Sequence, residues 1–108
     1  MSSTKAYKDF IIEQLSLLDG ITYKPMMGEF MLYYNGLIFG GIYDDRLLVK
    51  KVDTNEEYGF EEVIPYKNAK PMYYVDDVDN QDTLRDIVLD TCRGLKLKEK
   101  NKWVDLEY

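Results

Sequence analysis

The sequence predicts an α+β domain in which an antiparallel, mostly meander sheet of about five strands has helices packed on one face. Three observations predict it: apolar residues at helical spacing near each end, short aromatic and β-branched runs between them, and tight turns separating those runs. A chain of 108 residues with 45% hydrophobic composition has material for one core. We expect one two-layer domain, with residues 1–94 as its body and residues 95–108 as a Lys-rich extension of the last helix or a tail.

The first element is an amphipathic helix from Lys5 to Leu18. Its apolar residues recur at intervals of three and four and therefore share one stripe; they are Tyr7, Phe10, Ile11, Leu15 and Leu18. Ser3 or Thr4 is expected to cap the beginning of this helix, and Gly20 to end it. The stripe needs a second layer to pack against.

That layer is a meander predicted from the next thirty residues or so. Its strands are residues 21–26, 30–34, 37–42 and 47–51. Asn35-Gly36 is typical of a two-residue hairpin turn because both residues accept positive φ, and a second turn is expected at Asp44-Asp45. Connections this short join antiparallel neighbours.

The last third of the chain is expected to form a short helix, a strand and a final helix. The short helix begins near Asp53, and Pro65 ends it. Residues 72–75 form the last strand, Asn80 caps the final helix, and Gly94 can end that helix early. The inner face of the final helix consists of Leu84, Ile87, Val88, Thr91 and Leu95.

No residue pattern indicates catalysis or a metal site. The chain has no histidine, which excludes Ser-His-Asp and Cys-His activation and every His-containing zinc site. The lone Cys92 has apolar neighbours on the final helix and is interpreted as a buried hydrophobic residue. The aspartates of residues 76–82 lack the glycine and glutamate positions of a calcium-binding loop. We expect a non-catalytic protein without a metal or cofactor.

The charge of the chain argues against nucleic-acid binding. The net charge is −6, whereas affinity for phosphates comes from clustered basic residues. A locally basic C-terminus, with Lys96, Lys98, Lys100 and Lys102, is interpreted first as a solvated end and second as a contact for an acidic partner. The single cysteine, and the lack of a signal-like or membrane-spanning apolar run, predict a cytoplasmic protein without a membrane partner.

Several motifs, taken in order, resemble the TfoX N-terminal domain family of competence regulators. They are a strand with a Met-Gly turn at Met26-Met27-Gly28, the Asn35-Gly36 hairpin between apolar strands, an acidic turn before residues 47–50, and a Tyr-Tyr strand before the cap and helix at residues 72–84. Met27 stands where the family prefers Phe. The ordered set spans residues 5–93 and implies a secretion-chaperone-like two-layer fold, often dimeric, with a regulatory role.

Two pairs of adjacent tyrosines mark a candidate interaction surface. Because alternate strand residues point to opposite faces, one ring of each pair, Tyr33-Tyr34 and Tyr73-Tyr74, is expected on the helix side and one on the open face. Tyrosine on an open face suits a protein partner or a homodimer, and we include Trp103 in this surface. The alternative, that the rings only fill a half-exposed sheet, has equal weight.

A second functional hypothesis is a small-molecule pocket between the helices and the strands. It is expected near the signature turn formed by Met26, Met27 and Gly28. A nucleic-acid-associated regulator that uses the C-terminal lysines is the third hypothesis, ranked below the other two.

Overall fold

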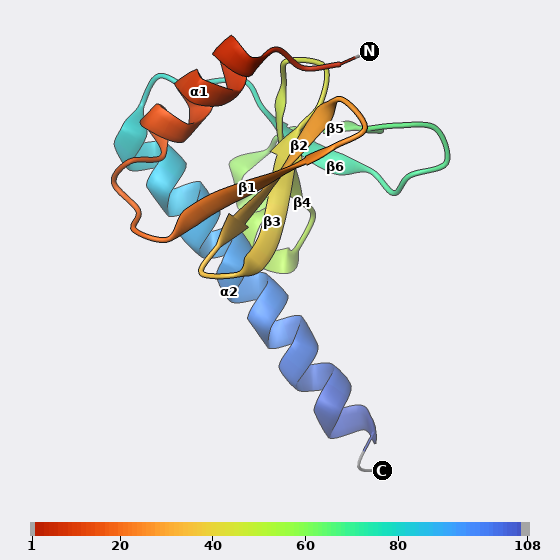
Figure 1. Ribbon diagram of the computed structural model, residues 1–108. Helices are drawn as coiled ribbons and strands as arrows, with labels where there is room; N and C mark the ends of the chain where they lie inside the picture. Colours follow the sequence, from red (N-terminus) through yellow and green to blue (C-terminus); the bar gives the residue numbers. More distant parts are fainter. Residues whose placement is uncertain (1, 107–108) are drawn as a thin grey trace.

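The framework of the protein is a six-stranded antiparallel sheet with two main helices packed against it (Figure 1). The computed structural model describes the backbone of residues 2–106 and the side chains of residues 2–98. The elements are α1 (Lys5–Gln14), β1 (Ile21–Met26), β2 (Glu29–Tyr34), β3 (Leu37–Ile42), β4 (Leu47–Lys50), the 3₁₀ helix η1 (Asp53–Tyr58), β5 (Glu61–Val63), β6 (Met72–Val75) and α2 (Gln81–Leu106).

The strand order is β1-β2-β3-β4-β6-β5, so the first four strands form the expected meander. The sixth strand, β5, was not expected from the sequence. It has only three residues, two of them glutamates, and it pairs with β6 at the edge of the sheet. The loop of residues 64–71 between β5 and β6 protrudes from the body (Figure 1).

Both predicted hairpin turns are confirmed. Asn35 and Gly36 have φ values of 49° and 84°, and Asp44 and Asp45 both have a φ of 54°. Positive φ at both central residues matches the twist of the flanking strands, which fixes their pairing. These two turns fix the antiparallel order of β2, β3 and β4, and a third two-residue turn at Met27-Gly28, with φ values of 50° and 86°, joins β1 to β2.

The first helix is shorter than predicted, because α1 ends at Gln14 and not near Leu18. The residues predicted as the last turn of this helix, 15–18, are not helical. Within them the Leu18 amide donates a hydrogen bond to the Leu15 carbonyl. Leu15 and Leu18 remain buried, but Phe10 is 37% exposed, so its place on the buried stripe was wrong. The predicted cap is confirmed: Thr4 Oγ1 accepts a hydrogen bond from the amide of Tyr7.

The short helix η1 also ends earlier than predicted. Gly59, with a φ of 71°, ends it well before Pro65. The predicted cap of α2 is confirmed, since Asn80 Oδ1 accepts a hydrogen bond from the Thr83 amide. Beyond that cap, α2 continues to Leu106, through residues expected to be either an extension of this helix or a tail, and it extends away from the sheet (Figure 1).

Gly94 lies inside α2 and does not end it. A Cβ atom at this position would lie 2.3 Å from Thr54 Oγ1 and 2.8 Å from Val52 Cβ. Gly94 therefore lets α2 approach η1 closely, and this approach is the physical reason for a glycine in the helix. The side chains of residues 99–108, with Lys100, Lys102 and Trp103, lie outside the described side chains.

The hydrophobic core fills the space between the helices and one face of the sheet. Its members are Ile11, Leu15, Leu18, Leu32, Phe39, Ile42, Leu47, Val49, Tyr73, Val75, Val78, Leu84, Ile87, Val88 and Cys92. The pairing of β2 with β3 shifts between Leu32 and Tyr33. Next to this shift, a Cβ at Gly40 would lie 2.1 Å from the Leu48 carbonyl oxygen, so glycine is needed for the approach of β4.

Within the part of the chain that the structure describes, no helix combines the length and the hydropathy needed to cross a bilayer.

Candidate functional site

Strand alternation gives the sheet a core-facing side and a second side, here called the open face. Tyr34 and Tyr73 contact the core, whereas Tyr33 lies on the other side, where Lys24 Nζ is 5.5 Å from its ring. Residues directly opposite each other on neighbouring strands point to the same side of the sheet. Lys24 pairs with Met31 of β2, and at the other end of the sheet Lys50 pairs with Met72 of β6, so these residues also lie on the open face. The side chains on the open face are Thr22, Lys24, Met26, Glu29, Met31, Tyr33, Ile38, Leu48, Lys50, Glu61, Val63, Met72 and Tyr74.

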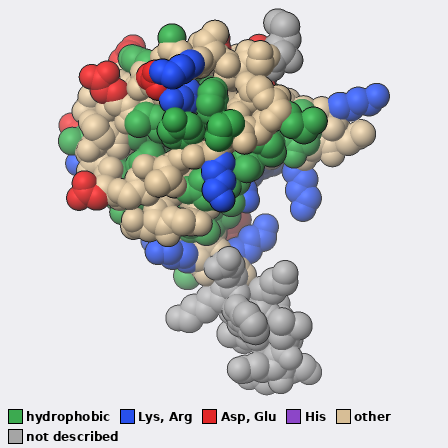
Figure 2. Space-filling view, in the orientation of Figure 1, with side chains coloured by type: hydrophobic (Ala, Val, Ile, Leu, Met, Phe, Trp, Pro, Cys, Tyr) green, Lys and Arg blue, Asp and Glu red, His purple; other side chains and the backbone are tan. Residues whose placement is uncertain are grey.

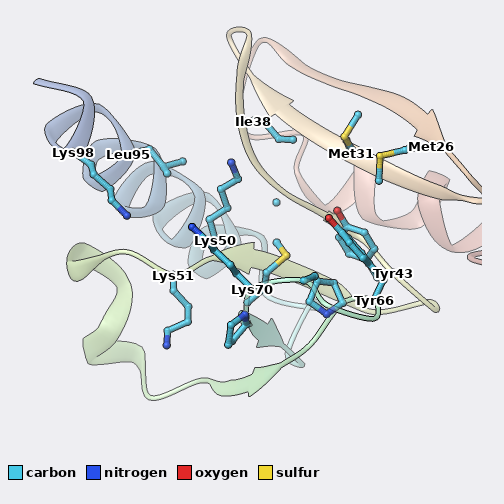
Figure 3. A pocket seen from close by; sticks show the side chains of 15 residues that line it. Met26, Met31, Ile38, Tyr43, Lys50, Lys51, Tyr66, Lys70, Leu95 and Lys98 are labelled. Carbon is cyan, nitrogen blue, oxygen red and sulfur yellow. The ribbon is translucent and has the colours of Figure 1, made fainter. Parts of the chain in front are cut away.

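The open face contains a cavity of about 660 Å³, here called the concave site. Strand residues form its floor, the β5–β6 loop forms one wall, and two α2 residues form another (Figure 3). Its lining consists of Met26, Met31, Ile38, Gly40, Tyr43, Lys50, Lys51, Pro65, Tyr66, Ala69, Lys70, Pro71, Met72, Leu95 and Lys98. The cavity therefore joins segments that are far apart in the sequence.

Most of this lining is apolar. Met26, Met31 and Ile38 lie around the space in Figure 3, and Met72 of β6 also lines it. The ring centroids of Tyr43 and Tyr66 are 6.2 Å apart. Burial, followed by the neighbouring Tyr66 and Glu29, raises the pKa of Tyr43. The Tyr43 hydroxyl therefore stays neutral at physiological pH and is able to donate a hydrogen bond.

Within the described side chains, the charged residues that line the concave site are all lysines: Lys50, Lys51, Lys70 and Lys98. Lys51 is paired with Glu62, whose Oε1 lies 2.7 Å from its Nζ, and this hydrogen bond raises the pKa of Lys51. Among the side chains of residues 2–98, no carboxylate lies within ion-pair distance of Lys50 or Lys70. The concave site is thus locally basic in a chain whose net charge is −6.

The surface view shows the same combination of properties. Hydrophobic side chains form a band across the face drawn in Figure 2, and basic side chains lie along its border toward the protruding loop.

The residues of the predicted signature turn do not form a pocket together. Met26 lines the concave site, but Met27 is 98% exposed at the β1–β2 turn. Gly28 contacts the N-terminal segment, where its carbonyl accepts a hydrogen bond from the Ser3 amide at 3.0 Å. The cavity lies on the open face, whereas the sequence placed it between the helices and the strands.

The tyrosine pairs divide between the two faces. Tyr33 and Tyr74 belong to the open face without lining the concave site, and Tyr34 and Tyr73 belong to the helix side. Their interaction role stays a prediction, and the side chain of Trp103 lies beyond those described.

Sequence reasoning missed the lysines of the concave site. Lys50 and Lys51 end a strand, Lys70 precedes a proline in a loop, and Lys98 was assigned to a basic tail. No spacing connects them, because the fold alone brings these segments together.

The described side chains offer no metal site and no activated thiol. Residues 2–98 contain no group of three or more His, Cys, Asp or Glu side chains arranged to hold a metal ion. Cys92 is buried, and burial raises its pKa to about 11, which keeps the thiol protonated at physiological pH.

Two comparisons with known proteins agree with this architecture. The chain is similar to an uncharacterized 12.7 kDa protein in the trpE 5' region of Spirochaeta aurantia, with 30% identity over 80 residues that cover 72% of this chain and 70% of the relative. The family model of the TfoX N-terminal domain matches residues 13–91, which include the whole sheet and most of the packed part of α2. This chain therefore belongs to the TfoX N-terminal domain family.

Proposed function

We propose that this chain is a non-catalytic regulatory domain that binds a partner protein through its open face and acts as a homodimer. The main support for this proposal is the concave site, a mostly apolar cavity of about 660 Å³ on a sheet face. The titratable lining residues among side chains 2–98 are lysines and tyrosines, and these residues include no carboxylate to form an acid–base pair. Membership of the TfoX N-terminal domain family supports a regulatory role.

Among the surfaces considered for the homodimer, the open face is better suited than the sheet edges. One edge, β1, contains Lys24 and Pro25, and the other, β5, has three residues that include Glu61 and Glu62. Charged residues, proline and short length are features that protect edge strands from pairing. A dimer through the open face would bring the lysines of two copies near each other, so added salt should strengthen it.

Light scattering at several protein and salt concentrations tests the homodimer. The expected mass at high concentration is twice the 12.7 kDa of one chain, and the dimer fraction should rise with salt. A protein that keeps the mass of one chain at every concentration contradicts the homodimer but leaves the binding role open.

Matched surface variants test the protein-binding role. Ile38→Asp places a charge in the concave site, whereas Leu17→Asp places the same charge at an exposed position, 47% accessible, outside the site. Tagged full chains are compared for proteins captured from the native host, after circular dichroism has shown that both variants fold. A partner lost by Ile38→Asp and kept by Leu17→Asp supports the open face; equal capture by both contradicts it.

A small-molecule-binding domain is the second candidate, and the size of the concave site favours it. Ligand pockets usually enclose about 300–1,000 Å³ and combine an apolar lining with a few polar groups. The concave site meets both conditions. Native mass spectrometry of the protein purified from its host tests this candidate, because a bound metabolite adds a defined mass.

A further inference from the structure

The charge of the concave site restricts what it can hold. Acidic residues outnumber basic ones by 20 to 14 in the chain, yet the described part of the lining contains four lysines and neither aspartate nor glutamate. Lysines approach the space from different segments: Lys50 from the end of β4, Lys70 from the β5–β6 loop and Lys98 from α2 (Figure 3).

Lys50 is the best placed of these lysines. It lies on the open face opposite Met72, and its side chain is only partly exposed. Its neighbour Lys51 is already neutralised by Glu62, whereas Lys50 has no carboxylate within ion-pair distance among the side chains of residues 2–98. A partly desolvated ammonium gains more from an added anion than a fully solvated one does.

The remainder of the lining prefers an apolar group. The apolar part of the lining includes three methionines, Met26 and Met31 from one half of the sheet and Met72 from the other. Ile38 also belongs to this apolar part. Methionine is flexible and polarisable, so it adapts to aliphatic or aromatic bodies of different shape. A fully hydrated inorganic anion would leave these side chains without a partner.

We infer that the concave site binds a small amphipathic anion, with its apolar body against Met31, Ile38 and Met72 and its carboxylate or phosphate beside Lys50 and Lys70. This inference rests on the second candidate function above, a small-molecule-binding domain. A cavity of about 660 Å³ holds a molecule of metabolite size. A protein partner would have to contact the open face around the cavity as well, because a stable protein interface buries roughly 800 Å² per partner.

The test uses three probes with the same alkyl chain and different head groups: octanoate, octan-1-ol and octyltrimethylammonium. The full chain is labelled with ¹⁵N, and amide shifts are followed as each probe is added. Octanoate should bind about tenfold more tightly than the alcohol, and the cation should bind most weakly, because two lysines contribute modest ion-pair energies. The shifted amides should belong to residues lining the concave site.

Two charge-matched double variants assign the effect to the site. Lys50→Gln/Lys70→Gln should reduce octanoate affinity about tenfold and bring it close to that of octan-1-ol. Lys5→Gln/Arg93→Gln changes the net charge equally at exposed residues that do not line the cavity, and it should leave the affinity unchanged. A third variant, Met31→Gln, should weaken all three probes without changing their order.

The outcomes separate this inference from the functions proposed above. Equal affinity for octanoate and octan-1-ol, with shifts at the concave site, overturns the anion preference but leaves a small-molecule pocket. No binding of any probe, or shifts mapped elsewhere, overturns the small-molecule site; the protein-binding role would then still depend on the Ile38→Asp comparison.

Discussion

Asn55 Nδ2 donates a hydrogen bond to Thr91 Oγ1 over 2.9 Å, and this contact joins η1 to α2 inside the protein. The same amide group donates to the Lys50 carbonyl at 2.8 Å, while Asn55 Oδ1 accepts from the Val52 amide at 3.1 Å. Asn55 is fully buried, and each of its polar atoms is satisfied. One side chain thus connects the end of β4, the 3₁₀ helix and the long helix.

Replacing Asn55 by alanine should lower the free energy of unfolding by about 2–4 kcal/mol, because it leaves buried backbone groups without partners. Urea denaturation followed by circular dichroism measures the loss. Glu57→Ala, at an exposed position of the same 3₁₀ helix, is the control and should change the stability by less than about 0.5 kcal/mol. Equal stabilities of the two variants would contradict the role given to Asn55.

The sequence predicts best those parts of the fold that local chemistry determines. The turns at Asn35-Gly36 and Asp44-Asp45 require positive φ, and these residues accept it. Once such short turns are fixed, the antiparallel order of β2, β3 and β4 follows. The cap at Asn80 was likewise evident because its action is confined to the first turn of α2.

Parts that depend on distant residues were not predictable in the same way. Glu61 and Glu62 pair with β6 although their own sequence has no strand pattern. Gly94 was interpreted as a helix end because the approach of Val52 and Thr54 is invisible from the sequence around it. The concave site depends on the folded sheet even more strongly, since its lysines come from separate segments.

Gly94→Ala should destabilise the protein by about 1–3 kcal/mol, although alanine favours helices by about 1 kcal/mol over glycine. The added methyl group would overlap Thr54 Oγ1 and the Val52 side chain. Thermal unfolding checks this, with Arg93→Ala on the exposed side of α2 as the control. Adding Thr54→Ala to Gly94→Ala should make the substitution at Gly94 less costly. If Gly94→Ala stabilises the chain, the close approach of α2 to η1 is wrong.

Cys92 should react slowly with Ellman's reagent in the folded protein. Burial raises its pKa to about 11, so near neutral pH its thiolate fraction is about a hundredfold below that of a thiol with a pKa near 9. Its side chain is only 3% exposed, which blocks the reagent as well. The absorbance of the released thiolate gives the rate, and protein in urea is the control. Equal rates with and without urea would show that Cys92 is accessible.

The Tyr58 hydroxyl donates a 2.6 Å hydrogen bond to Asp90 Oδ2, and this contact should make part of the stability dependent on alkaline pH. Burial, followed by the hydrogen bond to Asp90, raises the pKa of Tyr58 to about 12. Because the folded state holds this proton more tightly than the unfolded state, the contribution is complete below about pH 10 and declines as the pH rises toward 12.

The stability difference between the wild type and Tyr58→Phe tests this dependence. Measured by urea denaturation, it should be constant from neutral pH to about pH 10 and then shrink, because above that pH the unfolded state loses a proton that folded Tyr58 retains. Asp90→Asn removes the carboxylate that accepts this hydrogen bond, so it should lower the pKa of folded Tyr58; the decline should still begin near pH 10 but be smaller and end at a lower pH. A difference that stays constant up to pH 12, or grows, would mean that folding does not raise the pKa of Tyr58.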